Sequence, residues 1–203
     1  AFDPCQDATD CMVLTIQAAP VANAGADATI CEGESLELNG QAENYSSLLW
    51  ITQGDGTFTE QTSLSTIYVP GFLDQINGSA EICLLAGSFD PCEGATDCMT
   101  LTIQSLPQAD AGMDATICPE DTYQLNGSVE GAASFQWSTA GDGTFDNVSS
   151  LTATYFPGSD DQIFGFAQLC LTADGILPCG TVEDCMVLTI GSGPELVSAE
   201  AGD

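Results

Sequence analysis

The residues with chemical capacity in this chain are cysteines and carboxylates. Ten cysteines occur in 203 residues, and the 30 Asp and Glu residues are accompanied by no Lys, Arg or His, so the formal net charge is −30. Thiolates form disulfides or bind soft metals, whereas carboxylates bind hard cations or act as acid–base pairs. These two residue types set the chemistry open to the protein.

The missing residue types exclude most catalytic mechanisms and two classes of partner. Without His, Lys or Arg there is no base for a Ser or Cys nucleophile, no Schiff-base amine and no clamp for phosphate. A carboxylate pair remains, but repeated acidic residues are more typical of a solvated face. Nucleic acid and anionic lipid are bound mainly through Lys and Arg. We therefore predict a protein that is not an enzyme, binds no nucleic acid and does not insert into a membrane.

The cysteines follow an internal period of the chain. Trp50 and Trp137 lie 137 − 50 = 87 residues apart, and the same offset relates Cys31 to Cys118. Zinc is the rival to disulfides, but the tight Cys-x-x-Cys spacing and His are both absent. Three pairs of cysteines lie close together in sequence, and two further pairs each span most of a module. We therefore predict five disulfides: Cys5–Cys11, Cys92–Cys98 and Cys179–Cys185 as the close pairs, and Cys31–Cys83 and Cys118–Cys170 as the long ones. Disulfides favour an oxidising, extracellular location.

A period this long indicates an array of whole domains. It predicts the C-terminal end of a preceding module at 1–19, complete modules at 20–106 and 107–193, and the start of a following module at 194–203. Because both ends cut through a module, we expect the chain to belong to a longer array.

Apolar residues alternate with polar ones throughout both modules. The plainest case has Met99, Leu101 and Ile103 on one face, with Thr100 and Thr102 on the other. Period two is typical of strands, and no stretch shows a competing helical period. About seven short strands per module predict an all-β fold of tandem immunoglobulin-like β-sandwich modules.

The most recognisable repeated motif is a tryptophan followed by a Gly-Asp-Gly loop. We expect Trp50 and Trp137 to fill the core, since each shares the inward phase of its strand. In the loop we expect glycines with positive φ in a tight turn, and an aspartate that caps its own backbone.

The motif Trp-x-x-x-Gly-Asp-Gly-Thr-Phe resembles the signature of polycystic-kidney-disease (PKD) domains. Both modules also resemble the PKD-like repeats of giant Bacteroidota cell-surface proteins. This resemblance is carried by residues 24–31, residues 68–71, Asp74 and residues 97–103. That family includes gliding-motility adhesins exported by type IX secretion. The resemblance implies a repeat region that serves mainly as a stalk.

Two functions follow as expectations. The first is a non-enzymatic, disulfide-stapled, semi-rigid stalk or filament of a bacterial cell-surface adhesin, whose partners are neighbouring modules and possible further copies or surface polysaccharide. The alternative is a set of carbohydrate-binding accessory modules of a secreted enzyme. Tens of modules would favour the stalk, whereas two or three modules beside a catalytic domain would favour the accessory role.

Three further predictions concern sites. Calcium is the possible cofactor, because oxygen-only clusters suit a hard cation. The candidate ligands are Asp55, Asp74, Asp110 and Asp114. We expect them in turns at a module junction, where Glu32 and Glu34 also lie. Cys83 and Cys170 share strand phase with polar neighbours, so we expect peripheral bridges rather than bridges buried between the sheets.

An apolar patch is expected on the outer face of the first module. Leu49, Ile51 and Leu85 occupy outward positions where the second module has Gln136, Ser138 and Thr172. Such patches commonly mark interaction surfaces. The alternative is that the segment around Cys31, held by a bridge to Cys83, covers the patch within its own module.

Overall fold

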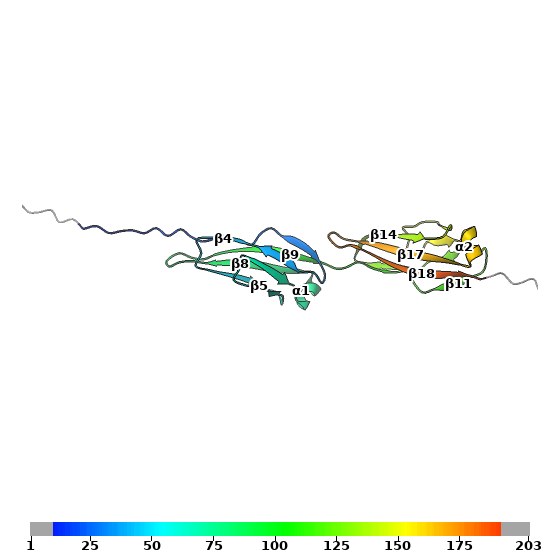
Figure 1. The fold of residues 1–203 in the computed structure, drawn as a ribbon, viewed down its shortest axis with the longest axis horizontal. Helices are drawn as coiled ribbons and strands as arrows, with labels where there is room; N and C mark the ends of the chain where they lie inside the picture. The colour runs from blue at the N-terminus through cyan, green and yellow to red at the C-terminus, as the bar shows by residue number, and fades with distance from the viewer. Residues whose placement is uncertain (1–9, 192–203) are drawn as a thin grey trace, which may run out of the picture. The chain divides into compact units, whose positions relative to one another are not determined.

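The computed structural model describes residues 10–191, which are almost entirely strands and connecting loops (Figure 1). The predicted pair Cys5–Cys11 and the predicted module start at 194–203 fall outside the described residues. No helix among the described residues is long and apolar enough to cross a membrane.

Each repeat contributes nine strands. Those of the first repeat are β1 (Val21–Asn23), β2 (Ala28–Cys31), β3 (Leu36–Asn39), β4 (Gln41–Glu43), β5 (Ser47–Thr52), β6 (Thr57–Phe58), β7 (Ser65–Val69), β8 (Ser79–Gly87) and β9 (Ala95–Gln104). Those of the second repeat are β10 (Gln108–Asp110), β11 (Ala115–Ile117), β12 (Tyr123–Gln124), β13 (Ser128–Glu130), β14 (Ala132–Thr139), β15 (Thr144–Phe145), β16 (Thr154–Phe156), β17 (Phe166–Gly175) and β18 (Thr181–Ile190).

Both repeats build the same three sheets. The first has a four-stranded sheet in the order β2-β9-β8-β5, a three-stranded sheet β3-β7-β6 and the pair β1-β4. The second repeats this with β11-β18-β17-β14, β12-β16-β15 and β10-β13. The pair β11/β18 is parallel, whereas β17 pairs antiparallel with both β14 and β18.

The alternation in the sequence decides which side chains enter the core. Met99, Leu101 and Ile103 on β9 are buried, while the threonines between them are exposed. The predicted inward phase is confirmed there. A strand that packs one face on a core and leaves the other wet produces this pattern.

Trp50 and Trp137 fill the core, as predicted, with 0% and 1% of their surface exposed. The indole Nε1–H of Trp50 donates to the backbone oxygen of Ser63 at 2.8 Å. Gly40, between β3 and β4, lies so close that an added Cβ would approach Trp50 at 2.7 Å. A glycine is therefore required there for the strand to pass the ring.

Two short helices were not predicted from the sequence. They are α1 (Phe72–Asn77) and α2 (Ser159–Phe164), and each is followed by a glycine with positive φ, 68° at Gly78 and 77° at Gly165. Six residues are too few for a helical period to stand out. Their boundaries are set instead by contacts from elsewhere in the chain, described below.

The chain divides into two compact units. Among described residues, one comprises 10–28, 35–74 and 80–101, and the other 29–34, 75–79 and 102–191. The core of the second unit includes Leu125, Trp137, Tyr155 and Leu171, all nearly inaccessible to solvent. The predicted module boundaries at 20–106 and 107–193 stay a prediction.

Candidate functional site

The Gly-Asp-Gly loop is a capping device for the helix that follows it in the same repeat. Asp55 is exposed after β5, and its Oδ1 accepts hydrogen bonds from the backbone N–H groups of Leu73 at 3.0 Å and Asp74 at 3.2 Å. The Leu73 bond is the main reason that the pKa of the Asp55 carboxyl lies below its ordinary value. The expectation that this aspartate caps its own loop is therefore corrected.

The second repeat has the same arrangement. Asp142 Oδ1 accepts from the N–H groups of Asp160 at 3.1 Å and Asp161 at 3.3 Å. The pKa of the Asp142 carboxyl is lowered mainly by the Asp160 bond. A carboxylate that receives the first amides of a helix stabilises its N-terminus.

Beneath each loop lies a buried tyrosine–aspartate pair. Tyr68 donates to Oδ2 of Asp74 at 2.6 Å, and the Gly71 N–H donates to the same oxygen at 3.1 Å. Both side chains are buried, with Tyr68 at 0% and Asp74 at 1% exposure. Burial, reinforced by the bond to Asp74, raises the pKa of Tyr68 to about 12.

The second repeat reproduces this pair too. Tyr155 donates to Asp161 at 2.6 Å, and burial together with that bond raises the pKa of Tyr155 to about 12. We did not predict this role from the sequence. The signal was the six-residue spacing from tyrosine to aspartate, present in both repeats.

The loop glycines are needed for close packing rather than for positive φ. Neither Gly54 nor Gly56 is among the residues with positive φ. A Cβ on Gly54 would collide with the carboxylate of Asp74, and one on Gly56 would collide with the Tyr68 hydroxyl. The predicted reason for these glycines was therefore wrong, although the requirement for glycine stands.

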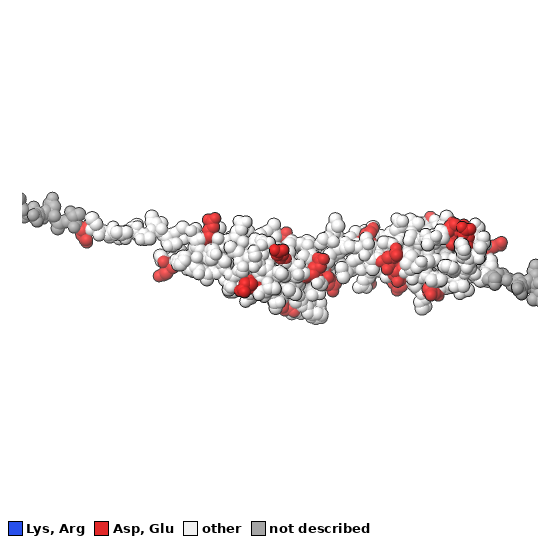
Figure 2. Space-filling model, in the orientation of Figure 1, with Lys and Arg blue, Asp and Glu red and all other residues white. Residues whose placement is uncertain are grey.

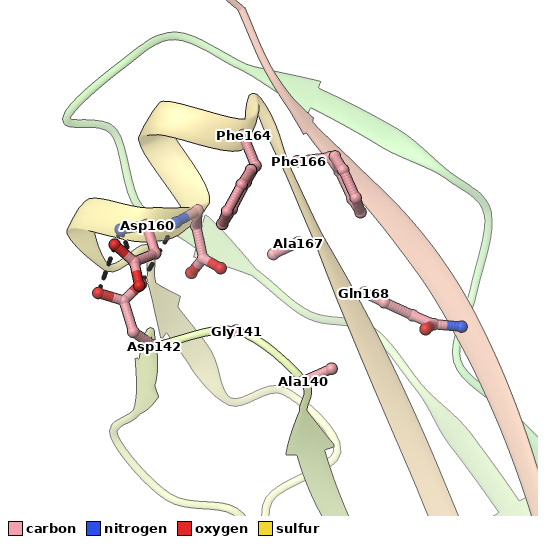
Figure 3. Close-up of a pocket in the computed structure, with 9 residues that line it drawn as sticks. Ala140, Gly141, Asp142, Asp160, Phe164, Phe166, Ala167 and Gln168 are labelled. Carbon is pink, nitrogen blue, oxygen red and sulfur yellow. Dashed lines mark hydrogen bonds between the residues drawn. The ribbon is translucent and has the colours of Figure 1, made fainter.

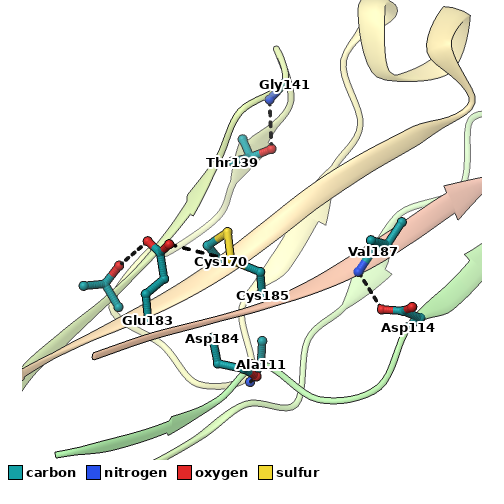
Figure 4. The surroundings of a disulfide bond; sticks show 10 residues. Ala111, Asp114, Thr139, Gly141, Cys170, Glu183, Asp184, Cys185 and Val187 are labelled. Carbon is teal, nitrogen blue, oxygen red and sulfur yellow. Dashed lines mark hydrogen bonds between the residues drawn. A yellow bond between two sulfur atoms is a disulfide. The ribbon is translucent and has the colours of Figure 1, made fainter. Parts of the chain in front are cut away.

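Other aspartates bond to the backbone between the first and last strands of a repeat. In the second repeat, Asp184 accepts from the Ala111 N–H and Asp114 accepts from the Val187 N–H, both at 2.8 Å (Figure 4). In the first repeat, Asp97 accepts from Ala24 at 2.8 Å. With no Lys or Arg in the chain, the backbone takes the place of ion-pair partners.

Each of the four predicted calcium ligands already accepts at least one hydrogen bond within the protein. Asp55 and Asp74 belong to the first unit, while Asp110, which accepts from Gly112 at 2.8 Å, and Asp114 belong to the second. Within residues 10–191, the one close group of three possible metal ligands is Cys170, Glu183 and Cys185, and its two cysteines are bonded to each other. Calcium stays a prediction.

Two disulfides join neighbouring strands on the outer face of a sheet. Cys83 on β8 bonds Cys98 on β9, and Cys170 on β17 bonds Cys185 on β18 (Figure 4). Cys170 and Cys185 are directly opposite in the antiparallel register, with Cα atoms 4.0 Å apart. Four of the predicted pairs are thus wrong: Cys31–Cys83, Cys92–Cys98, Cys118–Cys170 and Cys179–Cys185.

The physical reason lies in strand register rather than loop length. Cys83 shares the outward phase of Glu81, as predicted, so it faces the side chains of the adjacent strands and not the opposite sheet. Directly opposed residues of an antiparallel pair have their Cβ atoms within bonding reach. Both bridges join adjacent strands of one sheet and do not cross between the sheets, yet Cys83 is buried at 7% exposure, and the partners differ from the predicted ones.

The third disulfide joins Cys31, at the end of β2, to Cys179, in the loop between β17 and β18. Its two cysteines are 148 residues apart in sequence, and both belong to the second compact unit. Among described residues, Cys11, Cys92 and Cys118 are free.

A hollow adjoins α2 in the second repeat (Figure 3). It has a volume of about 390 Å³ and is lined by Ala140, Gly141, Asp142, Asp160, Asp161, Phe164, Phe166, Ala167 and Gln168. The rings of Phe164 and Phe166 are 71% and 53% exposed beside the carboxylates. The first repeat has Asn77 and Ser79 at the two phenylalanine positions, so the hollow has no aromatic counterpart there.

The predicted apolar patch is present on β5 and β8. Leu49 lies opposite Leu85 and Ile51 lies opposite Cys83 in the strand register. Leu49 is 40% exposed and Ile51 is 38% exposed. The alternative cover, a segment held by a Cys31–Cys83 bridge, loses its basis because Cys31 bonds Cys179 instead.

Carboxylates are spread over the face drawn in Figure 2 in small separate groups, with no cationic side chain among them.

No protein-family model matches the chain, and no curated protein matches it. Solved structures do. A three-domain immunoglobulin fragment of the titin I-band, and a Glu-to-Ala variant of it, each align with a TM-score of 0.55 and 12% identity, over 87% of this chain and 67% of theirs. The chain therefore has a tandem immunoglobulin-like β-sandwich fold.

Proposed function

We propose that this chain is an extracellular, non-enzymatic repeat region that forms a semi-rigid, disulfide-stapled stalk or filament of a bacterial cell-surface adhesin. The resemblance to gliding-motility adhesins exported by type IX secretion supports the adhesin assignment. Three disulfides in the described residues support the extracellular location. The carboxylates support a structural role, because those in the repeated loops accept hydrogen bonds from backbone amides of the helix that follows rather than forming an acid–base pair.

The observation that carries the proposal is the parallel pairing of β11 with β18. Ala115, Thr116 and Ile117 lie opposite Leu188, Thr189 and Ile190. β11 lies near the start of the repeat and β18 at its end, so tension on the chain, once the Cys31–Cys179 bond that bypasses β11 is opened, pulls these neighbours in opposite directions along their length. All the hydrogen bonds between them are then sheared together instead of breaking one at a time. This arrangement suits a stalk under tension.

Single-molecule stretching of the reduced 203-residue chain tests the proposal, because the Cys31–Cys179 bond would otherwise carry the tension past both repeats. We expect each repeat to resist until a single high-force event, because rupture depends on the unfolding barrier. The control pulls the same protein, reduced, between position 176 and the C-terminus, which peels β18 from its neighbours. Equal rupture forces in the two geometries, with both samples reduced, would contradict a tension-bearing role.

The stretching experiment also tests the two cross-strand disulfides. Each cross-strand disulfide closes a sequence separation of 15 residues. In the variant Cys31→Ser/Cys179→Ser, which lacks the bond that closes 148 residues, reduction should therefore lengthen each unfolding step by about 50 Å, at roughly 3.3–3.6 Å per extended residue.

A second candidate, carbohydrate binding, is favoured by the hollow beside α2. Exposed Phe164 and Phe166 offer apolar faces for sugar rings, and Asp142 and Asp160 offer hydroxyl acceptors (Figure 3). Titration with bacterial surface polysaccharide compares the wild type with Phe164→Asn/Phe166→Ser, the residues of the first repeat. Saturable binding lost in the variant would support this function, and binding by neither protein would remove it.

A further inference from the structure

We propose that the hollow beside α2 is a docking site for an arginine side chain of a partner protein. The guanidinium group would lie against the carboxylates of Asp160 and Asp161, and its plane and stem would pack on the rings of Phe164 and Phe166 (Figure 3). The proposal goes beyond the stalk role and does not rest on it. It assigns the hollow a charged ligand instead of a neutral sugar.

The hollow arises from differences between two repeats that are otherwise alike. In the first repeat, Gln53 donates a hydrogen bond to Glu81 at the corresponding place. The second repeat has Ala140 and Gln168 at these positions, since 140 − 53 = 87 and 168 − 81 = 87. The side chain of Ala140 is too short to make that contact, so a volume of about 390 Å³ stays open. This space is large enough to receive one side chain of a partner.

The second repeat also adds two aromatic rings and one carboxylate around that space. Phe164, Phe166 and Asp160 all line the hollow. The residues 87 positions earlier offer neither a ring nor a charge, and they are Asn77, Ser79 and Leu73. Both rings are more than half exposed, so their faces are open to a ligand. An aromatic face attracts a guanidinium group, and a nearby carboxylate pairs with it.

One oxygen of the buried Asp161 is also available to a ligand. Its Oδ2 accepts from the Tyr155 hydroxyl at 2.6 Å and from the Gly158 N–H at 3.0 Å, whereas Oδ1 accepts no hydrogen bond within residues 10–191. The side chain is 2% exposed, and no fully inaccessible side-chain oxygen of the described residues lacks a partner. Oδ1 therefore meets solvent, at the hollow that Asp161 lines. A Cβ on Gly141 would collide with this oxygen, so glycine leaves it uncovered.

The chemistry of the hollow favours arginine over other ligands. A carboxylate oxygen without a donor gains more from a cation than from a neutral hydroxyl, because charge-assisted hydrogen bonds are about twice as strong as neutral ones. A guanidinium group suits the rings better than an ammonium group, since it is planar, stacks on aromatic faces and donates several N–H bonds in a fixed fork.

The arginine has to belong to a different protein surface. The 203 residues contain no Lys, Arg or His, so a second copy of these repeats has no cationic side chain to offer. The formal net charge of −30 attracts a basic partner over a longer range. This attraction raises the association rate and weakens as salt is added.

The test titrates the isotope-labelled 203-residue chain with a blocked Gly-Arg-Gly peptide and follows backbone amide shifts by NMR. We expect saturable shifts at Gly141, Phe164 and Phe166 that weaken with added salt. No saturable shift is expected at their first-repeat counterparts, which serve as an internal control. The same peptide with glutamine in place of arginine should cause no saturable shift, and the lysine peptide should bind more weakly than the arginine peptide.

Three variants separate the hollow from the overall charge of the chain. Phe164→Asn/Phe166→Ser installs the first-repeat residues and should weaken binding by about two- to fivefold for each ring. Asp160→Asn removes one charge from the hollow and should weaken binding by a similar factor. Glu130→Gln removes one charge from an exposed position outside the hollow and should leave binding unchanged. All four side chains are exposed, so each variant should keep the wild-type melting temperature.

Several outcomes would overturn the proposal. Equal weakening by Asp160→Asn and Glu130→Gln would mean attraction by overall charge alone. Equal binding of the glutamine or lysine peptide would contradict recognition of arginine. Absence of saturable shifts with the arginine peptide, whether or not a neutral polysaccharide shifts the same amides, would remove the docking site. None of these results bears on the rupture force of the chain, so failure of the docking site is distinguishable from failure of the stalk proposal.

Discussion

Tyr155 donates a 2.6 Å hydrogen bond to the buried carboxylate of Asp161, six residues further along the chain. The same bond joins Tyr68 to Asp74 in the first repeat. Each pair fixes the strand that carries the tyrosine against the start of the short helix that follows it.

We expect Tyr155→Phe to lower the free energy of unfolding by about 1.5–3 kcal/mol, because it removes a hydrogen bond to a buried charged group. Tyr68→Phe should do the same in the first repeat. Chemical denaturation at neutral pH measures the loss, and Tyr45→Phe, at a partly exposed tyrosine, serves as control. Equal stability of Tyr155→Phe and the control would contradict the proposed lock.

The same tyrosines predict an alkaline limit to stability. Their folded pKa of about 12 lies above the ordinary value of 10.0, so folding favours the protonated hydroxyl. The contribution is fully present below pH 10 and is lost as the pH rises through about 12. Melting temperature measured across this range should fall for the wild type and fall less for Tyr68→Phe/Tyr155→Phe. Parallel curves would show that tyrosine ionisation is not the cause.

The loop aspartates predict an acid limit. The pKa values of Asp55 and Asp142 lie below the ordinary 3.8, so their contribution is present above that pH and is lost as the pH falls through the lowered values. Asp55→Asn should lower the melting temperature at pH 7, with a difference from wild type that shrinks on acidification. The control Glu37→Gln, on the exposed face of β3, should change neither the melting temperature at pH 7 nor its dependence on pH. A melting-temperature difference between Asp55→Asn and the wild type that stayed constant with pH would show that the charge of Asp55 is not the cause.

The cross-strand disulfides should stabilise each repeat to a similar degree. A bridge closing about 15 residues contributes roughly 3 kcal/mol by restricting the unfolded chain, so Cys83→Ser/Cys98→Ser should lose about that much. Cys170→Ser/Cys185→Ser should match it, and Cys92→Ser, which removes a free thiol, should lose little. Peptide mapping that recovered Cys31 linked to Cys83 would overturn the assignment.

The apolar patch predicts a lateral contact made by the first repeat. Leu49→Gln/Ile51→Ser installs the residues of the second repeat, and covering such side chains is worth roughly 1.5–3 kcal/mol each when they are fully buried. We expect self-association or partner binding to weaken while thermal stability is unchanged, as measured by sedimentation and melting. Lost stability with unchanged association would instead mean that the patch is covered within its own repeat.

The calcium hypothesis predicts a saturable heat in calorimetry and a higher melting temperature with calcium than with chelator. Asp110 and Asp114 are exposed and retain lone pairs beyond their backbone bonds. Asp110→Asn/Asp114→Asn should remove the heat without unfolding the second repeat. Absence of saturable heat together with an unchanged melting temperature would dispose of the site.

Local pattern was enough to predict the strands and the core. The alternation at Met99, Leu101 and Ile103, and the phase of Trp50 and Trp137, follow from strand geometry alone and needed no knowledge of the partner strand. The 87-residue offset likewise predicted that the two repeats would share one architecture. Each of these inferences depends on a pattern within the sequence and not on which strands pair in space.

Only the tertiary structure decided the partners of Cys83, Asp55 and Tyr68. Cys83 bonds Cys98 because β8 and β9 lie side by side, and spacing along the chain does not encode which strands become neighbours. Asp55 reaches the amides of residues 73 and 74 because a strand end and a helix start meet in space. These contacts depend on side-chain direction and long-range register, which a single sequence specifies only through the completed fold.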